Sequence, residues 1–98
     1  MVSMYRRGRI IEKKICNDLV DMGFCNIRRS AGSRGPSDIY AFKDGNKYYI
    51  QAKGNSADVG PAGIDRLRNH ARQRHGAAVV INRMDGKNKW RFFGNWND

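Results

Sequence analysis

The stretch Gly35–Lys53, GPSDIYAFKDGNKYYIQAK, decides how the rest of the chain is organised. In it, Asp38 follows a Pro-containing turn, and two apolar strands flank a polar turn at residues 44–46. Side chains alternate between the two faces of a strand, so Gln51 and Lys53 point to the same side. Asp38 lies at the mouth of the facing strand, where it can meet them. The stretch therefore predicts a β-hairpin that gathers three polar side chains at one strand edge.

These three side chains suit metal-assisted chemistry. A carboxylate and an amide carbonyl oxygen are ligands for a hard cation such as Mg²⁺. A lysine beside them can orient or deprotonate a water molecule. The alternative is that the charged residue at the strand end is only solvated surface, because short motifs of this kind often arise by coincidence.

Length and charge limit the class of protein. A chain of 98 residues forms one small domain, residues 1–98, with a single modest core. The formal net charge of +10, from 19 Lys and Arg against 9 Asp and Glu, predicts a polyanionic partner. Cys16 and Cys25 match no zinc-site spacing and are expected to be reduced. Without a bilayer-spanning apolar run or a signal peptide, a cytoplasmic protein that does not enter the membrane is expected.

The N-terminal part predicts a helix over residues 4–22. Apolar residues recur at Ile11, Ile15, Leu19 and Met22, which is the spacing of a helix that lays one stripe on a core. Gly23 is the expected residue just after the helix end.

Charged residues flank that apolar stripe. Glu12 lies at its margin, where it can face a site; the alternative is a surface acid paired with a nearby lysine. Arg6, Arg7 and Arg9 open the helix, although the helix dipole favours acids at that end. Local helix stability does not explain these arginines, so we interpret them as phosphate contacts.

A strand over residues 24–30 delivers Arg28 and Arg29 to a loop of small residues over 30–35. This loop contains Ser33 and Arg34, a hydroxyl and a guanidinium that can approach a phosphate closely and move on binding. The alternative is a plain flexible connection.

The C-terminal half predicts a helix over residues 63–75, a buried strand over 77–81 and a final strand over 89–93. The helix carries many basic residues, among them Arg66 and Arg72, which indicate either a solvated face or a nucleic-acid face. Together the elements predict an α/β fold with the order α-β-β-β-α-β-β around a mixed sheet. Four aromatic residues near the end predict core closure, a self-association surface or base stacking: Trp90, Phe92, Phe93 and Trp96.

Several motifs in this order closely resemble one known family. They are Met4–Gly8 (MYRRG), Glu12, the run 29–33 (RSAGS), Asp38, and the strand ending in Gln51-Ala52-Lys53. The chain thereby resembles the archaeal-type Holliday junction resolvases of the PD-(D/E)xK nuclease superfamily, and the likeness continues weakly to residues 90–92. The resemblance implies a restriction-endonuclease-like core, with the mixed sheet flanked by two helices.

The resemblance also implies roles for individual residues. Asp38 is the central metal ligand, Glu12 contributes from the first helix, and Gln51 stands at the third ligand position. Lys53 positions or activates the attacking water, and Arg29 grips the phosphate region that is cut. Ser33 lies on a mobile loop near the cleaved strand. Basic residues at seven further positions are expected to bind DNA: Arg6, Arg7, Arg9, Arg28, Arg34, Arg66 and Arg72.

Two departures from the family pattern affect the expected site. Gln51 stands where the family carries an acid, which removes one negative charge and predicts weaker metal affinity. Lys13, a further expected DNA contact, stands where resolvases usually have an arginine, so a point charge replaces a bidentate fork.

The expected function is a Mg²⁺-dependent endonuclease, with Mn²⁺ able to substitute, that resolves four-way DNA junctions as a homodimer by paired phosphodiester hydrolysis. One alternative is a nuclease of the same fold that acts on flap, nicked or duplex DNA, as in the virus-type replication-repair nucleases. Another is a catalytically silent DNA-binding domain that lost the reaction through Gln51.

Overall fold

The computed structural model describes the backbone of residues 4–30 and 35–97, and the side chains of residues 8–30 and 35–97. The elements follow the predicted order: α1 (Met4–Asp21), β1 (Cys25–Arg29), β2 (Ile39–Lys43), β3 (Asn46–Gly54), α2 (Pro61–Gln73), β4 (Ala77–Met84) and β5 (Lys87–Asn95). The predicted α/β class and mixed sheet are confirmed.

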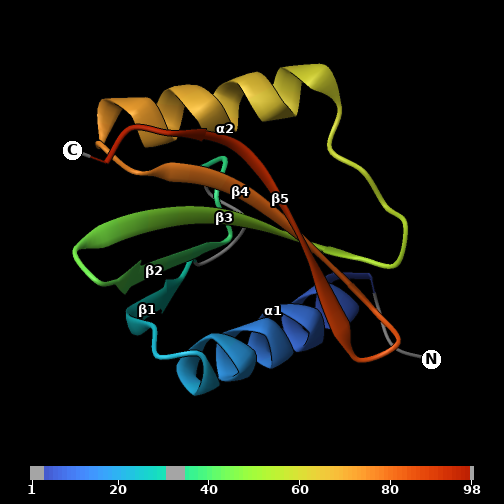
Figure 1. Ribbon diagram of the computed structural model, residues 1–98. Coiled ribbons are helices and arrows are strands. Elements are labelled where there is room, and N and C mark those ends of the chain that lie inside the picture. Colours follow the sequence, from blue (N-terminus) through green and yellow to red (C-terminus); the bar gives the residue numbers. More distant parts are fainter. Residues whose placement is uncertain (1–3, 31–34, 98) are drawn as a thin grey trace.

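The five strands form one sheet in the order β1-β2-β3-β4-β5. Neighbouring strands are antiparallel except β3 and β4, which are parallel because α2 carries the chain back between them. Figure 1 shows α1 on one face of the sheet and α2 on the other. The two helices therefore divide the molecule into an α1 side and an α2 side.

Each side has its own apolar cluster. On the α1 side, Ile15 and Leu19 of the helix are fully buried against Ile39, Ile50 and Ile81 of the sheet. On the α2 side, Leu67 and Ala71 are buried against a smaller set that includes Tyr49 and Val80. The predicted two-sided burial of residues 77–81 is correct, because all five are fully buried.

The prediction that Met22 joins the buried stripe is wrong. Helix α1 ends at Asp21, and Met22 lies in the following turn with 46% of its surface exposed. Gly23 takes a φ of 95°, a left-handed conformation that glycine adopts without strain. This turn brings Phe24 into the core in place of Met22.

Element boundaries also differ from prediction. Helix α2 begins at Pro61, two residues before the predicted start, because proline suits the first helical position, where its missing N–H costs nothing. Strands β4 and β5 extend to a tight turn at Asp85 and Gly86, both of which have positive φ. The longer hairpin carries Asn82 and Arg91, whose side chains contact the loop after β3.

The C-terminal aromatic residues divide between the core and the surface. Trp90 packs against the α1-side cluster, and Phe93 and Trp96 pack against the α2-side cluster. Phe92 stacks on Trp90 and keeps 61% of its surface exposed. Core closure therefore accounts for three of the four rings, and Phe92 stays on the surface.

Candidate active site

Asp38 is held in place by three backbone contacts at the start of β2. Its N–H donates to Ile50 O over 2.8 Å, and its carbonyl accepts from Ser30 N–H over 2.9 Å. The side chain is fixed as well, since Asp38 Oδ2 accepts the N–H of Ala52 over 2.9 Å. Asp38 thus connects Ser30, just after β1, to β3, and its carboxylate is held against the backbone of β3.

Gln51 and Lys53 flank Ala52 on β3 and share the strand face that looks toward α2. Both line a hollow of about 630 Å³ together with Arg66 of α2. The charge of Lys53 lowers the pKa of Asp38, although burial has the larger, raising effect. The hairpin therefore brings the three polar side chains of the predicted site close together.

Glu12 reaches this region from α1. Its Oε1 lies 3.5 Å from Nε of Arg29 on β1, and Arg29 also donates from Nη2 to the carbonyl of Arg9 over 3.2 Å. Gly54 allows the helix to come this close: a Cβ there would stand 2.6 Å from Cδ1 of Ile11. The absence of a side chain at the end of β3 is thus what lets α1 approach the strand ends that carry Asp38 and Lys53.

Two carboxyl groups in this cluster are destabilised in their charged form. Burial raises the pKa of Glu12, and the nearby charge of Asp38 raises it further, while Arg29 lowers it. Burial likewise raises the pKa of Asp38, against the lowering effects of the Ala52 N–H and Lys53. Two partly desolvated acids with mutual repulsion form a site that a bound cation would stabilise.

The donor set fits a divalent cation that prefers oxygen ligands. Glu12 Oε1 is buried, and its contact with Arg29 Nε is a long ion pair of 3.5 Å without hydrogen-bond geometry, so the oxygen retains capacity for a metal ligand. Within residues 8–30 and 35–97 no three His, Cys, Asp or Glu side chains form a metal-holding group, so the third protein oxygen would have to come from Gln51. Two carboxylates and one amide suit Mg²⁺, which keeps several water ligands.

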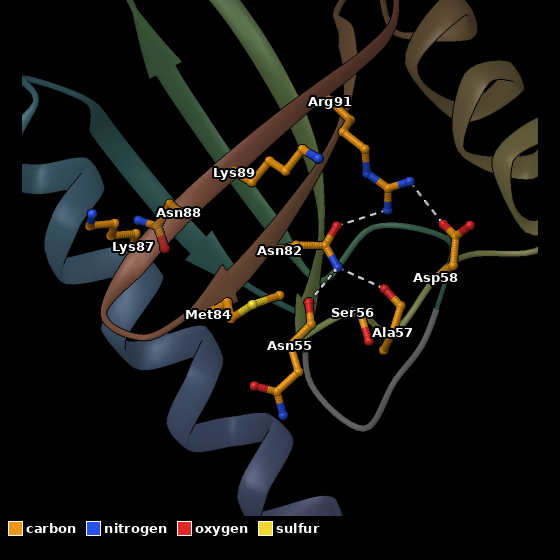
Figure 2. A pocket seen from close by; sticks show the side chains of 10 residues that line it. All are labelled: Asn55, Ser56, Ala57, Asp58, Asn82, Met84, Lys87, Asn88, Lys89 and Arg91. Carbon is orange, nitrogen blue, oxygen red and sulfur yellow. Dashed lines mark hydrogen bonds and ion pairs between the residues drawn. The ribbon is translucent and has the colours of Figure 1, made fainter.

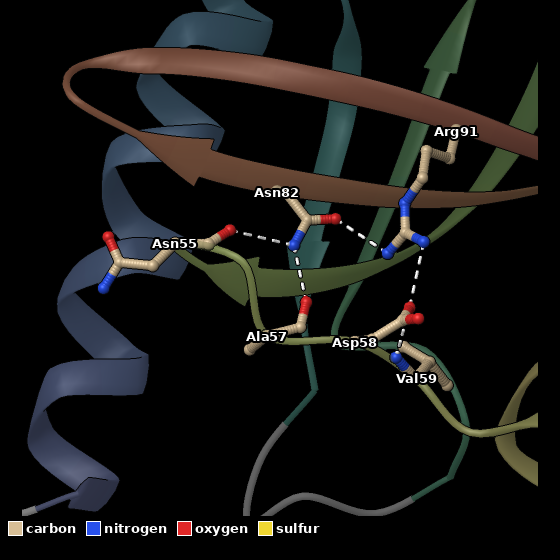
Figure 3. Close-up of polar contacts among 6 residues, drawn as sticks. All are labelled: Asn55, Ala57, Asp58, Val59, Asn82 and Arg91. Atoms are coloured by element: carbon tan, nitrogen blue, oxygen red, sulfur yellow. Dashed lines mark hydrogen bonds and ion pairs between the residues drawn. The ribbon is translucent and has the colours of Figure 1, made fainter.

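A loop over residues 55–60 forms one wall of the hollow, and a polar network holds it. The side-chain amide of Asn82 donates to Asn55 O over 3.2 Å and to Ala57 O over 2.7 Å, as Figure 3 shows. Arg91 donates to Asn82 Oδ1 over 2.8 Å and to Asp58 Oδ1 over 2.9 Å. Asn82 is only 7% exposed and is satisfied by these contacts. The network ties the loop after β3 to strands β4 and β5.

Sequence reasoning missed these positioning residues. Asn82 directly follows the buried run over 77–81, and a polar residue that continues such a strand is a signal of a buried hydrogen-bonding role. On the far side of the loop, a second hollow of about 390 Å³ is lined by Asn55, Asn82, Lys89, Arg91 and others, as Figure 2 shows.

The predicted DNA-binding residues lie in several places. Arg66 lines the hollow of Gln51 and Lys53, whereas Arg28 lines a different hollow on the α2 side. Arg72 donates to Asn69 Oδ1 over 3.2 Å and lines a small hollow that contains none of the predicted catalytic residues. Lys13 is exposed on α1.

The structure does not describe the side chains of four residues that were predicted to belong to the site. Ser33 and Arg34 lie outside the described residues, and so do the side chains of Arg6 and Arg7. Their predicted roles stay predictions. In the part of the chain that the structure describes, no helix is both long and apolar enough to cross a membrane.

Comparison with known proteins identifies the family and the fold. The family model described as archaeal Holliday junction resolvase (Hjc) matches residues 3–97. Among solved structures, the chain is similar to the 1.6 Å structure of Hjc, a Holliday junction resolvase from the archaeal hyperthermophile Archaeoglobus fulgidus. The TM-score is 0.73 at 24% identity, over 89% of this chain and 71% of that one, which confirms the predicted fold. No protein with a curated description matches the chain.

Proposed function

Because the chain belongs to the archaeal Holliday junction resolvase family, we propose that the cluster around Asp38 is its catalytic centre. The family assigns the chain to the structure-selective junction endonucleases. One observation supports the placement of the centre. The Asp38 carboxylate, fixed by the Ala52 N–H, lies beside Lys53 and close enough to Glu12 to raise the pKa of that acid.

We propose that Mg²⁺, with Mn²⁺ as a substitute, is held by Asp38, Glu12 and the amide oxygen of Gln51. When bound, the ion supplies charge that neutralises the phosphate oxygens and makes a water molecule more acidic. The roles of the protein residues follow from their positions. Asp38 cannot rotate freely because Ala52 N–H holds one of its oxygens. It therefore presents the other oxygen in a fixed direction.

Lys53 is proposed to position the attacking water. Its ammonium group stands on the same strand face as Gln51 and opens into the hollow that Arg66 also lines. There it can hold a water by hydrogen bonding and stabilise the negative charge that develops during in-line attack. Arg29, now 3.5 Å from Glu12, is proposed to bind the phosphate that is cut.

DNA is the proposed partner, and a homodimer is the proposed working form, because resolving a four-way junction requires a cut in each of two strands. The net charge of +10 supports DNA binding, since phosphate contacts dominate affinity in such complexes. Ser33 and Arg34 are proposed to contact the cleaved strand. The protein would work in the cytoplasm, on cellular or viral DNA.

The test compares an immobile four-way junction with linear duplex, each with Mg²⁺, with Mn²⁺ and with EDTA. Paired nicks on the junction alone, abolished by EDTA, are expected. Asp38→Asn and Lys53→Ala should each lower the cleavage rate at least roughly a hundredfold, the scale of losing one group that stabilises developing charge, while junction binding persists. Asp44→Asn, in the exposed turn before β3, is the matched control and should cut normally.

Unchanged cleavage in both Asp38→Asn and Lys53→Ala would contradict the placement of the site. Gln51 favours a second candidate, a DNA-binding domain without catalysis, because the site has one carboxylate fewer than the family pattern. Tight, salt-sensitive binding with no product at any metal concentration would favour that candidate. Equal cutting of flap, nicked and four-way substrates would instead indicate a nuclease of the same fold with another DNA substrate.

A further inference from the structure

A further hollow on the α2 side, the one lined by Arg28, has the composition of an anion-binding site. It has a volume of about 430 Å³ and lies where strands β1 to β3 meet the C-terminal part of α2. Three cations line it, Arg28, Lys47 and Arg74, together with the phenol groups of Tyr40 and Tyr49. No carboxylate is among its lining residues. The hollow therefore concentrates positive charge that no acid within it offsets.

A β-bulge creates this arrangement. The pairing of β1 with β2 shifts by one residue between Cys25 and Arg28, and Asn26 has a φ of 51°. Beyond the shift, Arg28 pairs with Tyr40 and Arg29 pairs with Ile39. Paired residues share a sheet face, so the bulge directs Arg28 to the α2 side and Arg29 to the α1 side. Asparagine tolerates the left-handed conformation that the bulge requires.

The floor of the hollow is rigid. Arg28, Tyr40 and Tyr49 are successive cross-strand neighbours on one face. The rings of Tyr40 and Tyr49 lie 5.4 Å apart, and the ring of His70 meets Tyr49 edge-on at 5.0 Å. Neither phenol hydroxyl forms a hydrogen bond with a described residue, so both can donate to a ligand.

The cations at the rim are held only by backbone groups or not at all. Lys47 Nζ donates to Arg74 O over 3.0 Å, and Arg74 Nη1 donates to His70 O over 3.3 Å. The side chain of Arg28 makes no hydrogen bond or ion pair with the described residues. Burial, and then the charge of Arg74, lower the pKa of His70, which favours the neutral form of its ring, so the positive charge of the hollow comes from the three longer side chains.

The hollow lies next to the catalytic cluster. Tyr40 follows Asp38 by two residues on β2, a separation of about 7 Å along the strand. Neighbouring phosphates of one DNA strand lie roughly 6–7 Å apart, because the strand winds around the axis as it rises, so this distance corresponds to about one nucleotide. Ser30 and Ser37, which also line the hollow, are joined by a hydrogen bond from Ser30 Oγ to Ser37 O over 2.8 Å.

We propose that this hollow binds a backbone phosphate of the strand being cut, about one nucleotide from the scissile phosphate. Arg28 and Arg74 would pair with the phosphate oxygens, and the Tyr40 and Tyr49 hydroxyls would donate to them from the floor. Such a contact fixes the position of the strand relative to Asp38. This inference rests on the proposed function in one respect, the identity of the bound strand as the one that is cut. Binding of a phosphate in the hollow does not itself depend on catalysis.

The test measures affinity for a four-way junction and for linear duplex in EDTA, as a function of salt. For Arg28→Gln/Arg74→Gln, affinity is expected to fall roughly tenfold, and the slope of log K against log salt to decrease by about 0.9, the loss of one phosphate contact. The control is Lys14→Gln/Arg68→Gln, which removes the same charge from exposed positions outside the hollow. It should change affinity and slope much less.

Equal losses in the two double variants would overturn the proposal, because charge alone would then explain them. Thermal unfolding checks that the variants fold. If the double variant does not, Arg28→Gln alone still tests the hollow, since the side chain of Arg28 makes no hydrogen bond or ion pair with the described residues. Tyr40→Phe removes one donor and should weaken binding about threefold; no change in both Arg28→Gln and Tyr40→Phe also overturns it. Absence of cleavage or of junction preference would refute the proposed function. The binding measurements in EDTA would still test the hollow, because they do not depend on cleavage.

Discussion

The two faces of the central sheet differ in what they contribute. On the α1 side, nine buried residues form a continuous apolar cluster, and the polar cluster of Glu12 and Arg29 stands only at its end. On the α2 side, the buried cluster has six residues, and hollows lined by cations open on both sides of it. We infer from this difference that the α1 side supplies more of the stability, while the α2 side has less apolar contact and more exposed cations, which are the groups proposed to bind DNA.

The largest expected effects come from truncating a core leucine on each side of the sheet. Leu19→Ala on the α1 side and Leu67→Ala on the α2 side remove the same atoms from fully buried positions. Each substitution should lower the free energy of unfolding by roughly 2–5 kcal/mol, with Leu19→Ala near the upper end of this range. The α2 side borders open hollows and can relax or admit water, so its cavity costs less. Urea unfolding at pH 7 measures both, and a larger loss for Leu67→Ala would contradict the division between the faces.

Adding a carboxylate to the α2 side tests the proposed metal site, which lies between the two sides of the sheet. Gln51→Glu supplies a third acid beside Asp38 and Glu12 and should lower the Mg²⁺ concentration for half-maximal cleavage about tenfold. Cleavage rate against Mg²⁺ concentration measures it. The matched control is Gln73→Glu, which adds the same charge at the exposed end of α2 and should leave the Mg²⁺ requirement unchanged.

The smallest expected effect concerns pH. Burial, and then Asp38, raise the pKa of Glu12 above its ordinary value of 4.5. An acid whose pKa is raised by folding stabilises the folded chain below its ordinary pKa, and that stability is lost as the pH rises through the folded pKa. Glu12→Gln, which is neutral at every pH, should therefore be more stable than the natural chain at pH 7 without metal, and no more stable below pH about 4.

Thermal unfolding from pH 3 to 8 in EDTA measures this difference. Asp44→Asn in the exposed turn should show no such pH dependence. A Glu12→Gln variant that is less stable at pH 7 would mean that the ion pair with Arg29 outweighs the burial of the carboxyl group. Added Mg²⁺ should reduce the difference in melting temperature between Glu12→Gln and the natural chain at pH 7, because only the natural chain has Glu12 as a metal ligand and is stabilised by the ion.

The sequence predicted the element types well because local patterns decide them. The apolar spacing at Ile11, Ile15 and Leu19 specifies an amphipathic helix whatever the rest of the chain does. Met22 was placed wrongly because spacing alone does not say where a helix ends; the turn at Gly23 decided that. Asn82 and Arg91 escaped notice because their roles depend on contacts with a loop 25 or more residues away in the chain.

By itself, the sequence determined the hairpin that carries Asp38, Gln51 and Lys53, since turn residues and side-chain alternation act over a few residues. Only the tertiary structure decided where the neighbouring arginines point. A bulge at Asn26 sends Arg28 toward the hollow of Tyr40 and Arg29 toward Glu12. Strand alternation reports that two neighbours face opposite ways, but strand pairing determines which face each one takes, because a shift of one residue exchanges them.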